Sequence, residues 1–273
     1  MRKVLVVLLL ALSASPALAA NCPTIHGGQL TVGTDNPAYP PWFGGNPPKG
    51  SKWKVSDPTS GKGYESAVAY AVAGQLGFRR SAVQWTYVPF NRSFAPGSKS
   101  FDFDINQISY TPARAKVVTF SNSYYDVNQA LVVLAGSKIA SATSIAGLRG
   151  YKLGAQLGTT SYGYIKDTIK PSQQPSVYQQ NAAAIQALKN KQIDGLIVDL
   201  PTAFYISAVQ VTNAKVRQFP AVPGGEHFGM VFAKGNGLAA CVNTALSKLK
   251  ANGTLARIQQ TWLAKATGAP VLK

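Results

Sequence analysis

The apolar residues of this chain recur in two patterns, one typical of strands and one typical of helices. Short apolar runs predict strands at residues 29–33, 83–88, 130–134, 151–155, 176–179, 193–198 and 228–233. Amphipathic periodicity predicts helices at residues 65–76, 159–169, 181–189, 201–210, 238–250 and 254–266. This alternation predicts βαβ units, and therefore an α/β protein with mostly parallel sheets flanked by helices.

The first residues form a different kind of segment. Arg2 and Lys3 precede an apolar run at 4–12, and Ala17-Leu-Ala19 supplies the small residues that signal peptidase requires. We therefore expect residues 1–19 to be a cleavable secretory signal. Cys22 follows Asn21 rather than small residues, which argues against a lipid anchor. No later segment approaches the roughly 18 to 20 apolar residues of a spanning helix.

The rest of the chain is long enough for two lobes of about 100 to 150 residues each. Two blocks of alternating strands and helices meet near residues 125–131 and again near 228–233. We expect a first lobe at 20–127, a second lobe at 128–230 and a return to the first lobe at 231–273. The chain would then cross twice between the lobes, at a double hinge.

The formal net charge is +17, and it falls to +15 once Arg2 and Lys3 are removed with the signal. The Lys and Arg residues are scattered rather than gathered in a run, which argues against a nucleic-acid partner. We expect most of them on the solvated surface. Their field would favour anionic ligands at long range, although the local pocket decides.

The two cysteines, Cys22 and Cys241, are an even pair in an exported chain, which favours one disulfide over two free thiols. The only histidines are His26 and His227, and there is no CxxC spacing. We therefore expect no metal site and no cofactor.

The most informative segment is residues 106–125, which follows the alternating run 101–105. Interpreted as a strand end and a short turn, it places Asn106, Gln107, Ser109 and Arg114 around one concavity. A guanidinium there is a fixed fork for a carboxylate or a phosphate. This pattern is typical of a receptor for a small anion.

Two further segments end strands with polar residues. Gly158 allows a tight turn before Thr159 and Thr160, whose hydroxyls and free backbone N–H groups are suited to a carboxylate, although either threonine is also an ordinary helix cap. Asp199 ends the strand at 193–198, where open α/β sheets bind ligands. It is suited to an ammonium group, or equally to capping the helix that begins near Pro201.

Taken in order, several segments resemble the polar amino-acid solute-binding proteins of ABC importers, that is, family 3 extracellular solute-binding proteins. The resemblance covers nearly the whole mature chain and rests on residues 33–42, 63–65, 109–121 with 124–125, 157–161, 193–199 and 253–255. It implies the type II periplasmic-binding-protein fold, in which two lobes close on a ligand. The implied partners are an amino acid or a related derivative and a membrane permease, with a monomeric protein in the periplasm.

The resemblance also implies roles for single residues. Arg114 would fork the α-carboxylate with help from Thr159 and Thr160, and Asp199 would accept from the α-ammonium beside Ser109 and the backbone near Asn106. Tyr39 would cover the ligand side chain. The neighbours that would determine its identity are Asp35, Trp42 and Gln107.

The chain departs from the common pattern of the family at two places. Asn106-Gln107 stands where many relatives have small hydroxyl or glycine residues, which leaves the side-chain preference open. Ala67 stands where many have a second acid after Gly63-Tyr-Glu65. Asp35 would suit a cationic side chain, or it caps the turn after its strand.

Two other classes of function stay open from the sequence. The same fold can serve as an enzyme, such as a cyclohexadienyl or arogenate-type dehydratase, which needs an acid or imidazole poised over the ligand. No nucleophile and base pair is evident, so we expect no catalysis. A soluble receptor for a separate sensor is the second alternative.

Overall fold

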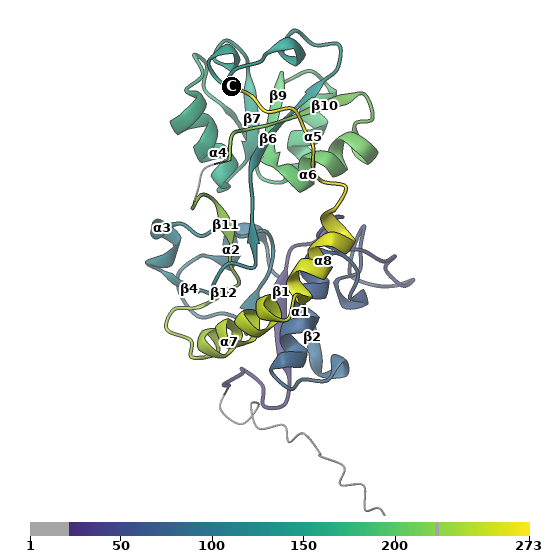
Figure 1. The fold of residues 1–273 in the computed structure, drawn as a ribbon, viewed down its shortest axis with the longest axis vertical. Coiled ribbons are helices and arrows are strands. Elements are labelled where there is room, and N and C mark those ends of the chain that lie inside the picture. Colours follow the sequence, from purple (N-terminus) through teal and green to yellow (C-terminus); the bar gives the residue numbers. More distant parts are fainter. Residues whose placement is uncertain (1–21, 222–223) are drawn as a thin grey trace, which may run out of the picture.

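The computed structural model describes residues 22–221 and 224–273, which form two lobes stacked along the long axis of the molecule (Figure 1). The expected secretory signal lies outside the described residues. Within them, no helix has both the length and the apolar character needed to cross a membrane.

The first lobe is built on a sheet with the strand order β2-β1-β3-β12-β4. Its strands are β1 (Leu30–Thr34), β2 (Val83–Tyr87), β3 (Phe103–Asp104), β4 (Val118–Phe120) and β12 (Val231–Ala233). Its helices are α1 (Tyr64–Gln75), α2 (Phe90–Ser93), α3 (Pro112–Ala115), α7 (Leu238–Ala251) and α8 (Thr254–Leu263). The larger apolar core of this lobe includes Leu30, Phe103 and Phe232, which are fully buried, and a smaller one includes Ile108, Val118 and Val231.

The second lobe has the strand order β10-β6-β9-β7-β8. Its strands are β6 (Gln129–Leu134), β7 (Leu153–Gln156), β8 (Ser176–Tyr178), β9 (Gly195–Asp199) and β10 (Ala214–Gln218). Its helices are α4 (Thr160–Tyr164), α5 (Asn181–Lys189) and α6 (Leu200–Tyr205), and π-helical turns at Ile165–Ile169 and Ile206–Gln210 extend α4 and α6.

The apolar run in β6 is unbroken because β6 is an interior strand of this sheet, covered on both faces. Ala130 and Val132 belong to the core on one face of the sheet, whereas Leu131 and Val133 belong to the core on the other. A strand covered on both faces is apolar at every position rather than at alternate ones.

The α/β class and the two-lobed fold are confirmed, but the expectation of mostly parallel sheets is wrong. In each lobe two of the four strand pairings are antiparallel. The reason is that β6 and β12, which enter the two sheets directly after the hinge, run against their neighbours. The strand expected at 228–233 is also two strands, because β11 (His227–Phe228) belongs to the hinge.

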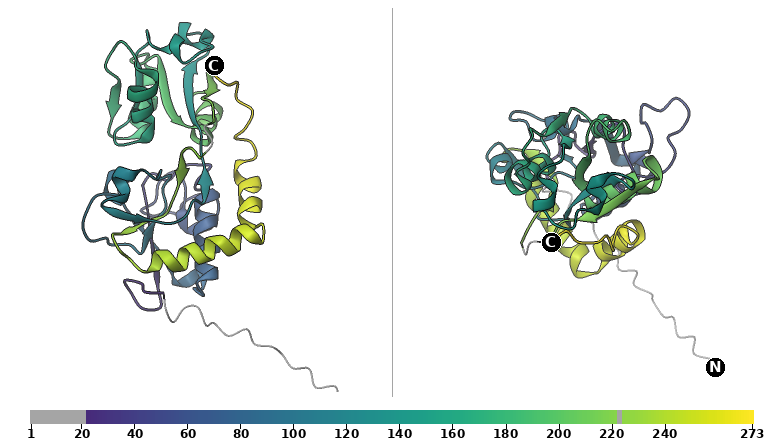
Figure 2. Two further views of the ribbon diagram at one scale, coloured as in Figure 1. Left: turned by 60° about the vertical axis from the view of Figure 1, so that its left-hand side comes forward. Right: turned by 90° about the horizontal axis from the view of Figure 1, so that it is seen from above.

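The hinge consists of β11 paired antiparallel with β5 (Tyr125–Asp126), so the two crossings support each other. A third connection lies outside this pair. After α8 the chain climbs along the second lobe (Figure 2), where Val271 pairs with Gln218 and Leu272 is fully buried. The assignment of all of 231–273 to the first lobe is therefore wrong for the C-terminal tail.

Gly63 allows the loop that contains Trp42 to pack closely against the start of α1. Gly63 has a φ of +90°, and a Cβ there would lie 2.4 Å from the Cα atom of Phe43. Only glycine fits this close approach. Directly after it, the backbone N–H groups of Tyr64 and Glu65 donate to the carbonyls of Pro41 and Trp42 at 2.9 Å, which fixes the Trp42 loop against α1.

The expected disulfide between Cys22 and Cys241 is confirmed, and it joins the start of the described chain to α7. The two residues are 219 positions apart. A cross-link over so long a separation strongly restricts the unfolded chain.

We predict that the double substitution Cys22→Ala, Cys241→Ala lowers the free energy of unfolding by about 3 to 5 kcal/mol. Urea unfolding at neutral pH measures this difference. Adding a reductant should destabilise the unmodified protein by a similar amount and leave the double variant unchanged; equal stability of the two proteins would contradict a stabilising role.

Candidate ligand-binding site

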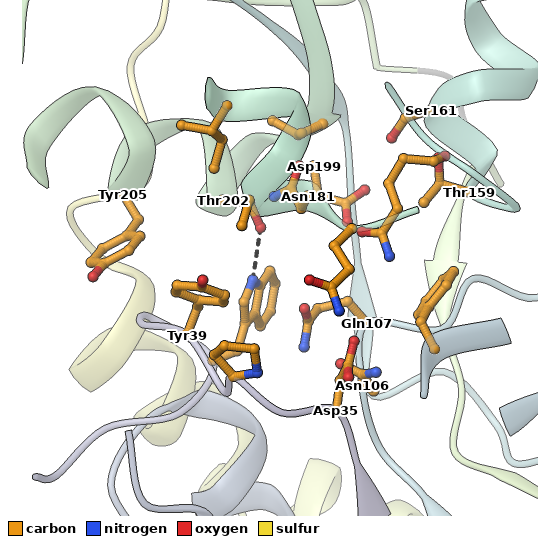
Figure 3. A pocket seen from close by; sticks show the side chains of 18 of the residues that line it. Asp35, Tyr39, Asn106, Gln107, Thr159, Ser161, Asn181, Asp199, Thr202 and Tyr205 are labelled. Atoms are coloured by element: carbon orange, nitrogen blue, oxygen red, sulfur yellow. Dashed lines mark hydrogen bonds between the residues drawn. The ribbon is translucent and has the colours of Figure 1, made fainter. Parts of the chain in front are cut away.

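A cavity of about 120 Å³ lies between the two lobes and is lined by residues of both (Figure 3). An engineered cavity of about 150 Å³ holds benzene, so this space is on the scale of a small molecule. Nine of the ten ligand-binding residues predicted from the sequence line it: Asp35, Tyr39, Trp42, Asn106, Gln107, Ser109, Thr159, Thr160 and Asp199. Arg114 is not among the lining residues.

Asp199 ends β9 and directs its carboxyl group to the cavity rather than to the helix that follows. It precedes α6 at the capping position, but its side chain makes no capping hydrogen bond. Instead, Gln129 Nε2 donates to Asp199 Oδ1 at 2.8 Å. Burial raises the pKa of Asp199 well above its ordinary value, and the nearby negative charge of Glu226 raises it further. A cation placed beside this acid would favour its ionised form.

Gln129 holds a second carboxylate, that of Glu226. Its Nε2 donates to Glu226 Oε2 at 2.8 Å, and its Oε1 accepts from Ser161 Oγ at 2.6 Å. The Ser109 and Thr160 hydroxyls donate to Glu226 Oε1. Donors from both lobes therefore converge on the Glu226 carboxylate.

The two threonines of the 158–161 turn make different contacts. Thr159 is an ordinary helix cap, because its hydroxyl accepts from the backbone N–H of Tyr162 at 3.2 Å. Thr160 has a hydroxyl oxygen 3.3 Å from that of Ser109 on the opposite lobe. The turn thus brings one hydroxyl from the second lobe against one from the first.

Arg114 also spans the two lobes, behind the cavity wall. Its guanidinium donates to the carbonyl of Ser109 at 2.6 Å and to that of Gly158 at 2.8 Å. The ring of Phe94 lies 4.1 Å from the guanidinium carbon, a cation–π contact. Burial lowers the pKa of Arg114 to about 10, while the charges of Glu226 and Asp199 raise it. The predicted fork to a ligand carboxylate stays a prediction.

Gln107 is held in an unusual backbone conformation by a buried acid. Its φ is +48°, in the left-handed region that glycine adopts more readily. The backbone N–H of Gln107 donates to Glu65 Oε1 at 2.6 Å, and its side-chain amide donates to Glu65 Oε2. The Tyr124 hydroxyl also donates to Glu65. These bonds determine where the 106–109 turn meets the cavity.

Asn106, which precedes Gln107 on this turn, has an unpaired hydrogen-bond donor within the described chain. Asn106 Nδ2 is buried and has no hydrogen-bond partner among the described residues. Buried donors are rarely left unsatisfied, so an unpaired one in a cavity wall points to a ligand acceptor.

Aromatic rings close one side of the cavity. The indole Nε1 of Trp42 donates to Thr202 Oγ1 across the lobes at 2.9 Å, shown as the dashed line in Figure 3. The rings of Tyr39 and Tyr205 face each other from opposite lobes, with centroids 6.4 Å apart. A ligand side chain in the cavity would therefore contact apolar faces as well as polar groups.

The local charge of the cavity opposes that of the whole chain. Asp35 and Asp199 are its charged lining residues, and no Lys or Arg of the described chain lines it. Asp35 Oδ1 accepts from the N–H of the adjacent Asn36 at 2.7 Å. Burial raises the pKa of Asp35. The wall therefore suits a cationic or neutral polar group despite the net charge of +17.

Sequence reasoning did not name Gln129, Ser161, Thr202, Tyr205 or Glu226 as site residues. One signal was available for Glu226, because the chain has only ten acids and this one follows Gly224-Gly225 at the second crossing. Ser161 stands in the 157–161 segment on which the resemblance rests, whereas Gln129 had no signal beyond its place next to a predicted strand. Among residues 22–221 and 224–273, no group of three or more His, Cys, Asp or Glu side chains is arranged to hold a metal ion.

The fold agrees with comparisons to known proteins. The family model of bacterial extracellular solute-binding proteins, family 3, matches residues 30–265. The chain belongs to this family. It is 28% identical over 214 residues to the ABC transporter glutamine-binding protein GlnH of Bacillus subtilis, covering 77% of this chain and 76% of that protein.

Two further relatives of this solute-binding protein carry names that mention arginine. ABC transporter arginine-binding protein 1 of Escherichia coli is 30% identical over 169 residues, which is 60% of this chain and 67% of that protein. The solved structure of an ancestral arginine-binding protein bound to glutamine is 28% identical with a TM-score of 0.71, and the match covers 86% of this chain and 98% of that one.

We predict that Glu65 makes the stability of this solute-binding protein depend on pH. Burial raises its pKa from 4.5 to about 7, against the hydrogen bonds from Tyr124 and Gln107, which lower it. Folding therefore favours the protonated acid. This contribution is fully present below the unfolded pKa and is lost as the pH rises through about 7, a change of about 3 kcal/mol.

Glu65→Gln should show a flatter decline of unfolding free energy between pH 4.5 and 7 than the unmodified protein. Urea unfolding at several pH values tests this. Asp167→Asn, on the exposed π-helical turn, is the matched control and should keep the original slope. Identical slopes for Glu65→Gln and the unmodified protein would refute the prediction.

Proposed function

We propose that this protein is the substrate-binding component of an ABC importer, and that it binds a polar amino acid or a closely related derivative between its lobes. The observation that carries this proposal is the cavity to which both lobes contribute polar groups. Contacts such as Trp42 to Thr202 exist only when the lobes are together. A ligand that bridges the same surfaces would select the closed state, which a permease can recognise.

We assign the ends of the ligand from the polar groups of the cavity. Asp199 would receive the α-ammonium, because it is a buried acid whose ionisation a cation would restore. The α-carboxylate would lie toward the Ser109 and Thr160 hydroxyls, on the side of the Arg114 charge. Asn106 Nδ2 is a further donor for a ligand oxygen.

The ligand side chain would lie between the aromatic rings and Asp35. Tyr39, Trp42 and Tyr205 offer flat faces, and Asp35 offers a carboxylate. This combination favours a cationic or amide-bearing side chain. It is consistent with relatives that are named for arginine and glutamine.

The proposed role is binding without turnover, by a monomer acting in the periplasm after export, with no nucleic-acid partner. The named relatives are transport proteins. Asp199, which lines the cavity, and Glu226, which lies beside it, each accept a hydrogen bond from Gln129 Nε2.

A thermal-shift screen of ligand-stripped protein tests the proposal. The panel contains the proteinogenic amino acids, ornithine, citrulline and dicarboxylates. A ligand at 100 times its dissociation constant stabilises the folded state by about 2.7 kcal/mol. Stabilisation by polar amino acids, recovered unchanged by chromatography after incubation, is expected. Silence across the panel, or conversion of the ligand, would overturn the proposal.

We predict that Asp199→Asn weakens binding of the best amino acid by about 2 kcal/mol or more, because the ammonium loses its buried partner. Isothermal titration measures the loss. The analogue without the α-amino group should bind both proteins alike, which separates a lost ammonium contact from damage to the cavity. Asp167→Asn again serves as the control for charge.

Arg114→Ala should weaken binding by about 3 kcal/mol or more, since its charge supports the ligand carboxylate in a desolvated site. Arg257→Ala, which removes an exposed guanidinium from α8, is the control. Near-normal affinity of Arg114→Ala for every ligand in the panel would reject this role.

A further inference from the structure

Glu226 stands at the second hinge crossing, directly before β11. Its backbone carbonyl accepts from the Val127 N–H at 3.0 Å, which ties the residue to the first crossing. The side chain is half-buried and extends toward the cavity wall. Glu226 is therefore placed where the two lobes and the hinge meet.

The carboxylate of Glu226 already makes the contacts of a bound carboxylate. Its Oε1 accepts from the Ser109 and Thr160 hydroxyls, one on each lobe, and its Oε2 accepts from Gln129 Nε2 at 2.8 Å. Its negative charge also raises the pKa of the Arg114 guanidinium, against the effect of burial. These hydroxyls and this guanidinium are the groups that the proposed function assigns to the ligand α-carboxylate.

The carboxylate of a zwitterionic ligand therefore competes with the Glu226 carboxylate, which has the same negative charge. Its carboxylate must displace Glu226 from three hydrogen bonds, or lie beside it in a poorly solvated cleft where like charges repel strongly. A ligand that has the ammonium but no carboxylate neither displaces Glu226 nor is repelled by it. It can still bind Asp199 and Asp35, which line the cavity.

We propose that Glu226 is a specificity-determining residue that supplies an internal carboxylate to this subsite and shifts the preference of the cavity from an amino acid toward the corresponding amine. The inference rests on the proposed function, because it needs Asp199 to hold the ammonium and the cavity to hold the side chain. It names the ligand class that gains from Glu226, which is an organic cation without a carboxylate.

Matched ligand pairs test this directly. Arginine and agmatine differ only in the α-carboxylate, and so do lysine and cadaverine. Isothermal titration would give the ratio of the dissociation constants of amino acid and amine for the unmodified protein, for Glu226→Gln and for Asp126→Asn. Asp126 is an exposed acid on β5, so its variant removes an equal charge beside the hinge without touching the cavity.

Glu226→Gln should lower the ratio by at least about tenfold, through tighter binding of the amino acid, weaker binding of the amine, or both. Asp126→Asn should leave it unchanged. Glu226→Asp, which keeps the charge but shortens the side chain, should give an intermediate ratio and provides the test if the glutamine variant does not fold.

Two results would overturn the inference in different ways. If amino acids bind and the ratio stays within about twofold in both Glu226 variants, Glu226 does not determine this preference and the proposed function stands. If no member of either pair, nor any other amino acid, binds the unmodified protein or a variant, the proposed function falls and the inference falls with it.

Discussion

The side-chain amide of Gln129 holds two carboxylates together, and the geometry of the cleft depends on this contact. Gln129 begins β6, Asp199 ends the adjacent β9, and Glu226 comes from the returning hinge segment. Two acids at such short range repel each other unless donors and cations compensate them. The compensation comes from the Gln129 amide, from the Ser109 and Thr160 hydroxyls, and from the positive charge of Arg114. Separating the lobes would remove the Ser109 donor and the Gly158 contact of Arg114 while leaving the acids near the hinge.

The acids of this basic chain are concentrated where the lobes meet. The chain has ten acidic residues; Asp35 and Asp199 line the cavity, and Glu65 and Glu226 accept hydrogen bonds from the lining residues Gln107 and Ser109. The scattered cations cover the outside, where water and salt screen them. The lining of the cavity is therefore acidic although the net charge of the whole chain is +17.

Local patterns predicted ten ligand-binding residues, and nine of them line the cavity. Thr159, Thr160 and Asp199 follow strands, and Ser109 and Asn106 follow another, so the carboxyl edges of two sheets bring them to one cavity. The structure shows which of these side chains bond to the nearby backbone: Thr159 caps its helix, Asp35 accepts from the N–H of the adjacent Asn36, and Asp199 does not cap α6. The antiparallel strands were not foreseen, because strand direction depends on how the chain returns through the hinge. The C-terminal tail has no pattern of its own that assigns it to the second lobe.

The sequence by itself predicted the two-lobed α/β fold, the disulfide pair and the family. The fold follows from the periodicity of apolar residues, the disulfide from the even cysteine count, and the family from motifs of fixed spacing. The tertiary structure alone decided the contacts of Arg114 and Glu226. Glu226 is 117 residues from Ser109 and 97 from Gln129 along the chain, so no local pattern links them. Only the return of the chain through the hinge places this acid among donors from both lobes, and the same return leaves Arg114 behind the wall with backbone carbonyls as partners. Long-range electrostatic compensation is a property of the folded arrangement, because a charge is balanced by whichever groups folding brings within a few ångströms of it.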